Sequence, residues 1–452
     1  MFSPGPPLLR ALGATAVVVV AAVVAVHLRA VARASVVAQE GCAPDPPRPL
    51  HCREVAAGEA VQPALDALPS GESLCLAPGE HRGAVRLTRP VTLWGPRSAV
   101  LRSTGEGTTV RVEPGAAGAR LLGFTVRGSG GRYDQEDAGV RVEANDVEVR
   151  GVRVERAVFG VLVYRARAVT VREVEVVGSG ERALGLRGDG IRLWEAQDCL
   201  VEGNRVRASR DVVVWYSPRN RVVNNTVEGG RYGTHLMYAN DCVVEGNRYR
   251  GDEVGVFVMY SHRVTLGRNV ITEATGAAGV GVGLKDSGDV TMTRNDLAAN
   301  TVGLYLDQSP GGGRETNRFH HNAFRGSRTA VVFHACERGN VFEGNAFVSN
   351  AAQVAVEGGA ETSGARWEAN VFDDYQGYDL DGDGRGDVPY TVRSLVSDLR
   401  DAHPDLGFFD GTPALALLDV ASRVAPLYAP RTLVVDAHPR VGRTATEVLH
   451  AN

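Results

Sequence analysis

The stretch VEGNRV, residues 201–206, decides the fold of this chain, because its pattern returns seven more times. An aliphatic residue is followed by two spacers, an asparagine, one spacer and a second apolar residue. The recurring asparagines are Asn204, Asn225, Asn247, Asn269, Asn295, Asn322, Asn345 and Asn370, and their successive separations are 21, 22, 22, 26, 27, 23 and 25 residues. Weaker versions precede them at Val149–Val154 and Val171–Val176. Repeats of this length are typical of a solenoid.

A second short segment lies between consecutive asparagine phrases, and GTHLM (233–237) and GVFVM (255–259) are examples. Apolar and variable residues alternate in it, which indicates a half-buried strand. Glycine and asparagine at the corners tolerate positive φ. We therefore predict an all-β chain that forms a right-handed parallel β-helix, with the asparagine amides stacked from rung to rung.

The predicted organisation has four parts. Residues 1–34 form a signal peptide or an uncleaved N-terminal anchor, and residues 41–372 form the β-helix, with an N-terminal cap that contains a helix-compatible stretch at 60–71. An Asp/Gly-rich capping loop over 373–390 follows. The tail, 391–452, contains an apolar stretch at helical spacing over 411–428, which favours a docking helix.

Composition and the N-terminus restrict the partners and the compartment. The 49 basic and 53 acidic residues give a formal net charge of −4, which makes nucleic acid an unsuitable partner. Arg10, the apolar run 11–26 and the small residues of AVARA (30–34) indicate export to the periplasm, with cleavage after Ala34. Export permits disulfides among the six cysteines, and the sequence leaves their connectivity open.

Two methionines occupy matching places in consecutive rungs of the predicted solenoid. Met237 and Met259 lie 22 residues apart in a chain that has 4 Met in total. The alternation predicts that both point outward from neighbouring strands, with His235 in the adjacent outward column and Trp194 and Trp215 continuing the methionine column. Two thioethers and an imidazole favour Cu(I). The alternative is an apolar strip that another subunit covers.

Four further residues of the outer face extend this hypothesis. His262 and His334 are candidate secondary ligands or transfer stations for the metal. Lys285 and Asp307 continue the methionine column and match an ordinary cross-strand ion pair, so we predict no catalytic residues and no enzyme activity. The alternative function is a periplasmic carbohydrate-binding or polysaccharide-modifying β-helix, with Trp194 and Trp215 as a sugar platform.

The stretch DLDGDGRGD (379–387) predicts a Ca²⁺ site at the C-terminal end of the solenoid. Its alternating carboxylates match the first half of a calcium loop, although Tyr390 stands where a bidentate glutamate is expected. The alternative is a turn without an ion. The candidate ligands are Asp379, Asp381, Asp383 and Asp387.

Six phrases resemble one protein family: GDGIRLW, YGTHLMYAND, VGLKDS, GLYLDQSP, FHACERGNVFEGNAF and YDLDGDGRGDVPY. They are similar to NosD, the family of periplasmic maturation proteins for nitrous oxide reductase, and the resemblance covers about residues 50–430. It implies a non-enzymatic β-helix that works with an ABC-type ATPase, its membrane subunit and a copper chaperone. It also implies delivery of copper to the copper–sulfur centre of nitrous oxide reductase, through a His/Met region that maps onto His235, Met237 and Met259.

Overall fold

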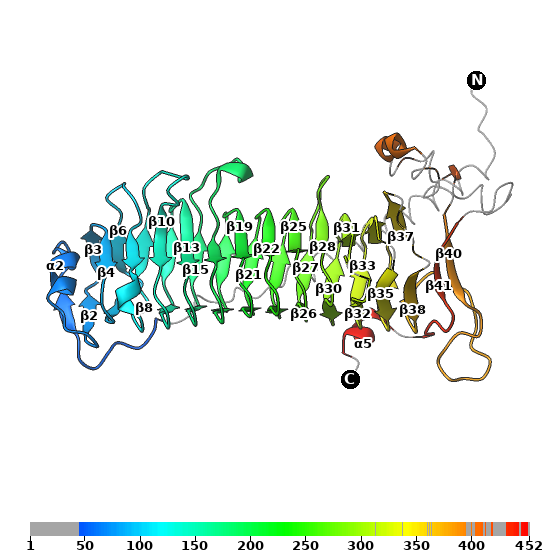
Figure 1. Cartoon of the computed structure of the whole chain (residues 1–452), viewed down its shortest axis with the longest axis horizontal. Coiled ribbons are helices and arrows are strands. Elements are labelled where there is room, and N and C mark those ends of the chain that lie inside the picture. The colour runs from blue at the N-terminus through cyan, green and yellow to red at the C-terminus, as the bar shows by residue number, and fades with distance from the viewer. Residues whose placement is uncertain are drawn as a thin grey trace, which may run out of the picture. The chain divides into compact units, whose positions relative to one another are not determined.

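The computed structural model describes residues 45–311, 313–336, 338–358, 360, 362, 364–394, 399, 403–409, 412, 417–418, 431–442 and 444–450. Its strands form three sheets of 16, 13 and 12 strands, which we name sheets A, B and C (Figure 1). Each rung contributes one strand to each sheet. This is the right-handed parallel β-helix that the repeat predicts.

One rung shows how the sequence repeat becomes structure. The asparagine phrase supplies β20 (Arg221–Val223) of sheet A and β21 (Thr226–Glu228) of sheet B, and the second segment supplies β22 (Tyr232–Met237) of sheet C. Successive strands of a sheet pair in parallel. Because inward residues alternate with outward ones, the aliphatic positions of all three strands meet in one continuous core.

Sheet C carries the outer face that concerns function, and its twelve strands stack in chain order. They are β4 (Val85–Leu87), β7 (Val110–Val112), β10 (Ala138–Val142), β13 (Phe159–Tyr164), β16 (Ile191–Trp194), β19 (Asp211–Trp215), β22 (Tyr232–Met237), β25 (Val254–Met259), β28 (Val280–Lys285), β31 (Val302–Asp307), β34 (Thr329–His334) and β37 (Ala352–Glu357).

The recurring asparagines form a buried ladder at the corner between sheets A and B, as predicted. In the middle of the ladder, Asn247 Oδ1 accepts hydrogen bonds from the backbone N and Nδ2 of Asn225 at 2.8 and 2.9 Å. Its own Nδ2 donates to the Val222 carbonyl at 2.9 Å and to Asn269 Oδ1 at 3.0 Å. Each amide thus satisfies backbone groups that the corner withdraws from water, so the ladder fixes the register of neighbouring rungs.

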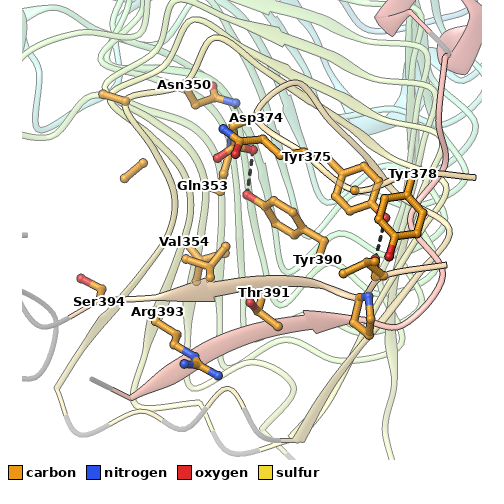
Figure 2. Close-up of a pocket in the computed structure, with 17 residues that line it drawn as sticks. Asn350, Gln353, Val354, Asp374, Tyr375, Tyr378, Tyr390, Thr391, Arg393 and Ser394 are labelled. Atoms are coloured by element: carbon orange, nitrogen blue, oxygen red, sulfur yellow. Dashed lines mark hydrogen bonds between the residues drawn. The ribbon is translucent and has the colours of Figure 1, made fainter. Parts of the chain in front are cut away.

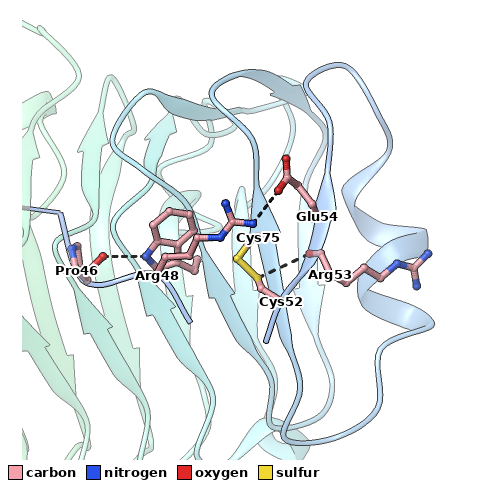
Figure 3. The surroundings of a disulfide bond; sticks show 7 residues. Pro46, Arg48, Cys52, Arg53, Glu54 and Cys75 are labelled. Carbon is pink, nitrogen blue, oxygen red and sulfur yellow. Dashed lines mark hydrogen bonds and ion pairs between the residues drawn. A yellow bond between two sulfur atoms is a disulfide. The ribbon is translucent and has the colours of Figure 1, made fainter. Parts of the chain in front are cut away.

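The N-terminal end is closed by helix α2 (Val61–Asp66), which buries Val61 and Leu65 against the core (Figure 1). A disulfide joins Cys52, immediately before β1 (Arg53–Val55), to Cys75 within β2 (Ser73–Leu76) (Figure 3). The bond resolves the connectivity that the sequence leaves open for these two cysteines. The remaining cysteines of the described residues, Cys199, Cys242 and Cys336, are free and buried.

The C-terminal end is closed by part of the tail, which the sequence does not predict. Strand β41 (Thr432–Asp436) pairs with β38 (Gly364–Glu368) in sheet A and with β40 (Tyr390–Arg393). Its fully buried Asp436 accepts hydrogen bonds from the backbone N and Nδ2 of Asn370, both at 2.9 Å. A carboxylate therefore ends the amide ladder as a pure acceptor.

Other parts of the predicted organisation lie outside the described residues. These are the leader over 1–34 and most of the predicted docking helix over 411–428, of which only 412, 417 and 418 are described. The last sheet-B strand of the solenoid is β39 (Val371–Phe372). Among the described residues, no helix has the length and apolar character needed to cross a membrane.

Removing one amide of the ladder tests its structural role. We expect Asn247→Ala to destabilise the fold by about 3 kcal/mol, because it leaves buried donors of Asn225 and a buried carbonyl without partners. The measurement is the denaturant midpoint. The control is Asn224→Gly, which removes an exposed neighbouring amide at a positive φ of 57°. Equal effects of the two substitutions would contradict the role of the ladder.

A second column of polar residues lies five positions after the ladder, and one member is an acid. The Oδ1 atoms of Asn300 and Asn350 accept hydrogen bonds from backbone N–H groups of the preceding rung, and their Nδ2 atoms donate to carbonyls. Asp252, by contrast, has a buried Oδ2 without a partner among the described residues. Burial, together with the nearby charges of Glu228 and Asp211, raises the pKa of Asp252 to about 8. Asp252 is therefore protonated at neutral pH.

This protonated carboxyl makes stability depend on pH. The folded pKa lies above the unfolded value of about 3.9, so the free energy of unfolding falls as pH rises from that value to about 8. We expect Asp252→Asn to remove this slope, and its gain in melting temperature over the natural chain should be larger at pH 8 than at pH 5. The reciprocal substitution Asn300→Asp should introduce a similar dependence of stability on pH. If Asp252→Asn raises the melting temperature by the same amount at both pH values, Asp252 ionises normally and the proposal is wrong.

Candidate functional site

The outer face of sheet C presents two columns of side chains in the predicted register. Strand pairing aligns His235 with Phe257 and Met237 with Met259, and the next strand follows in the same register. The first column is Arg192, Val213, His235, Phe257, Gly283, Tyr305 and Val332, and the second is Trp194, Trp215, Met237, Met259, Lys285, Asp307 and His334. The parallel ladder therefore places the two thioethers on adjacent strands, about 4.8 Å apart along the column.

The first column is covered, although its side chains point away from the core. Only 5% of His235 is exposed, because aromatic rings surround it: Tyr232 lies at 4.6 Å, Trp215 at 5.2 Å and Phe257 at 6.4 Å between ring centroids. The outward direction of His235 is therefore not accompanied by exposure to solvent. The alternation gives the direction of a side chain, but the size of its neighbours decides its exposure.

Both nitrogens of His235 have close partners. Trp215 Nε1 donates to Nδ1 at 3.2 Å, and Nε2 lies 3.3 Å from Met259 Sδ. Met237 and Met259 are half-buried, so their thioethers lie at the boundary between the aromatic surround and solvent. The structure thus brings together the three residues that the sequence singles out as candidate ligands.

His235 is a neutral imidazole throughout the physiological range. Burial, followed by the charges of Arg231 and Arg210, lowers its pKa to about 3. A neutral imidazole beside two thioethers is a soft ligand set without formal charge. Such a set suits Cu(I) better than a hard divalent ion, which prefers carboxylate oxygens.

A buried cluster of charges lies next to the histidine, and the sequence analysis missed it. Asp189 is fully buried and accepts from Arg192 Nε at 2.6 Å and Arg210 Nη2 at 2.8 Å. Asp211, also buried, accepts from Arg231 Nε at 3.1 Å. Burial raises the pKa of Asp189, and the two arginines oppose that shift. The cluster holds three guanidinium groups in place, two of which keep His235 unprotonated.

The other predicted metal residues lie apart from this group. His334 Nδ1 lies 2.9 Å from Asp307 Oδ1, and Lys285 Nζ lies 2.5 Å from Asp307 Oδ2. His262 Nδ1 lies 2.9 Å from Glu315 Oε1. His334 follows the methionines by three rungs, about 14 Å, so it cannot bind the same ion. The predicted Lys285–Asp307 pair is present, and the histidine extends it to three residues.

Three tyrosines form a stacked ladder beside the methionine column. Tyr216, Tyr238 and Tyr260 directly follow Trp215, Met237 and Met259, and neighbouring rings are 5.1 Å apart at 14°. Their φ values of 51°, 52° and 48° are unfavourable for bulky side chains. Because Tyr216 and Tyr238 are more than 40% exposed, their faces can stack on a partner surface or a sugar ring. The recurrence of WY, MY and MY at the strand ends is the sequence signal for this ladder.

The C-terminal loop brings together three of the four predicted calcium ligands. Asp379, Asp381 and Asp387 have carboxylate oxygens within 4.8 Å of one another, and Asp383 is not in the group. Hydrogen bonds from Gly384 and then from other backbone N–H groups lower the pKa of Asp379. Tyr390 is no ligand: it is buried, its ring stacks on Phe372, and its hydroxyl donates to Asp374.

A cavity of about 730 Å³ lies near this loop, between β37 and β40. Figure 2 shows Tyr375, Tyr378 and Tyr390 on one side of it and Arg393 on another. The Tyr375 hydroxyl donates to the Val388 carbonyl at 2.6 Å, so this ring braces the cap. In the order of the rungs, the cavity is remote from the candidate copper ligands His235, Met237 and Met259.

The chain is similar to known proteins both in sequence and in fold. A family model described as periplasmic copper-binding protein (NosD) matches residues 168–377, which include both columns of the site. Two relatives are named probable ABC transporter binding protein NosD. The relative from Pseudomonas aeruginosa is 28% identical, and the match covers 82% of this chain and 89% of the relative. The relative from Stutzerimonas stutzeri is 27% identical, and the match covers 82% of this chain and 87% of the relative. Among solved structures, the A-module of the mannuronan C-5 epimerase AlgE6 of Azotobacter vinelandii matches 70% of this chain and 93% of its own, with 15% identity and a TM-score of 0.48.

Proposed function

This chain belongs to the NosD family, and from that premise we propose that it receives Cu(I) in the periplasm and delivers it for maturation of the copper–sulfur centre of nitrous oxide reductase. The family description supports copper and the compartment, and the predicted leader over 1–34 supplies the route of export. The names of the relatives support a binding role rather than an enzymatic one.

The observation that carries the proposal is the contact of His235 Nε2 with Met259 Sδ at 3.3 Å, beside the in-register Met237. Bonds from imidazole and sulfur to a d10 ion, about 2.0 and 2.3 Å long, place the two donor atoms about 3.5 Å apart at a tetrahedral angle. The nitrogen and the sulfur are therefore already close to the separation that a shared ion requires. Neutral ligands leave the single charge of Cu(I) uncompensated, which favours moderate affinity and release.

Delivery requires partners, and the relatives' names support one of them. We propose an ABC-type ATPase with its membrane subunit as the permanent partner, a copper chaperone as donor and nitrous oxide reductase as acceptor. The half-buried methionine edge of the site is the side from which a donor or acceptor can reach the ion. His262 and His334 would serve as later stations only after they leave Glu315 and Asp307.

Replacement of both thioethers tests the copper site. We expect Met237→Leu with Met259→Leu to lower Cu(I) affinity at least about tenfold, because a soft ligand is lost while side-chain volume is nearly kept. The measurement is a competition titration against a chromophoric Cu(I) chelator under anaerobic conditions. The control is Met292→Leu, since Met292 is fully buried in the core. Unchanged affinity of the double variant would rule out the site.

We also propose that Asp379, Asp381 and Asp387 hold a structural Ca²⁺ ion that stiffens the C-terminal cap, because their oxygens converge. Ca²⁺ should raise the melting temperature relative to a chelator-treated sample, and Asp379→Asn should abolish the rise. The matched control is Asp383→Asn, which changes a carboxylate outside the group. A rise that survives in Asp379→Asn would exclude this loop as the binding site.

A further inference from the structure

The hydrogen bonds of His235 determine which of its nitrogens carries the proton. An indole Nε1–H can only donate, so its contact with His235 Nδ1 at 3.2 Å makes Nδ1 an acceptor. A neutral imidazole has one proton, which must therefore lie on Nε2. The Nε2–H group points at Met259 Sδ, 3.3 Å away, and the sulfur accepts the hydrogen bond. The imidazole and the thioether are therefore joined by an N–H···S contact.

This tautomer is unable to bind a metal at Nε2. Ligation requires the nitrogen lone pair, and in this tautomer the lone pair of Nε2 is occupied by the proton. The free lone pair belongs to Nδ1, which faces the indole and lies away from the methionine sulfur. His235 Nε2 and Met259 Sδ are thus at the separation that a shared ion requires, but the proton on Nε2 prevents the ion from binding there.

We propose that Trp215 is a positioning residue that holds His235 in the non-binding tautomer, and that Cu(I) loading at the proposed site displaces its indole. The N–H bond at Nε2 breaks, an N–H bond forms at Nδ1, and the Nε2 lone pair binds the ion, with no net release of a proton. The new Nδ1–H cannot face the indole Nε1–H, because both are donors. The indole therefore leaves its place.

The displaced indole belongs to the surface column, which gives loading an external consequence. Trp215 is half-buried and packs against Trp194, with ring centroids 5.7 Å apart. Movement of Trp215 changes the aromatic surface beside the tyrosine ladder. A loaded site therefore differs from an empty one in a feature that a partner can contact.

The test compares Trp215→Phe with the natural chain in the same Cu(I) competition titration. Phenylalanine keeps an aromatic ring and removes the donor, so affinity should rise about fivefold, the factor that one net hydrogen bond represents. In a His235→Ala background the same substitution should have no effect, because the restrained nitrogen is absent. An equal rise in both backgrounds, or no rise in either, would overturn the proposal.

A second measurement uses the unaltered chain with Ag(I) as a redox-inert d10 probe. The chain has 4 Trp, and Trp215→Phe identifies the indole N–H resonance of Trp215 in a ¹H–¹⁵N spectrum. This resonance should shift on loading more than that of Trp94, whose Nε1 donates to the Pro46 carbonyl near the N-terminal end of the solenoid. A Trp215 resonance that stays in place while Ag(I) binds would reject the displacement.

The proposal rests on the copper site, and the two can fail separately. If the methionine substitutions lower affinity while Trp215→Phe leaves it unchanged, the site stands and the role of Trp215 falls. If neither the methionine nor the histidine substitutions alter affinity, both proposals fall.

Discussion

The structure depends on the parallel register between rungs, and a buried column of amides maintains that register. A solenoid corner turns backbone groups away from the strand ladder and from water, where an unpaired donor costs about 1–3 kcal/mol. From Asn204 to Asn370, each asparagine supplies acceptors and donors to the neighbouring corner. Because each amide must meet the next, insertions between rungs are confined to loops that leave the register intact.

The register in turn builds the candidate site. Met237 and Met259 meet because the sheet C strands align residue for residue over five pairs. A slip of one position would turn both side chains to the other face of the sheet. The soft ligand pair is therefore a consequence of the same constraint that holds the core. The His235 ring crosses from its own column to the sulfur of the next rung, so the site spans two rungs.

The chemistry of the site depends on burial as much as on residue type. An exposed histidine titrates near neutral pH, whereas burial and the nearby Arg231 and Arg210 lower the pKa of His235 to about 3. The arginines are held by fully or almost fully buried carboxylates, Asp189 and Asp211. Charges that are fixed in this way cost no reorganisation when an ion arrives, since each guanidinium already has its partner.

The sequence by itself determined the repeat, the fold class and the pairing of the two methionines, because each depends on spacing along the chain. Tertiary structure alone decided that His235 is covered, that its ring nitrogens contact Trp215 and Met259, and that Asp436 closes the ladder. These contacts join residues from different rungs or from the distant tail, and they depend on side-chain size and direction. Periodicity fixes which residues are neighbours, but only packing fixes which of their atoms touch.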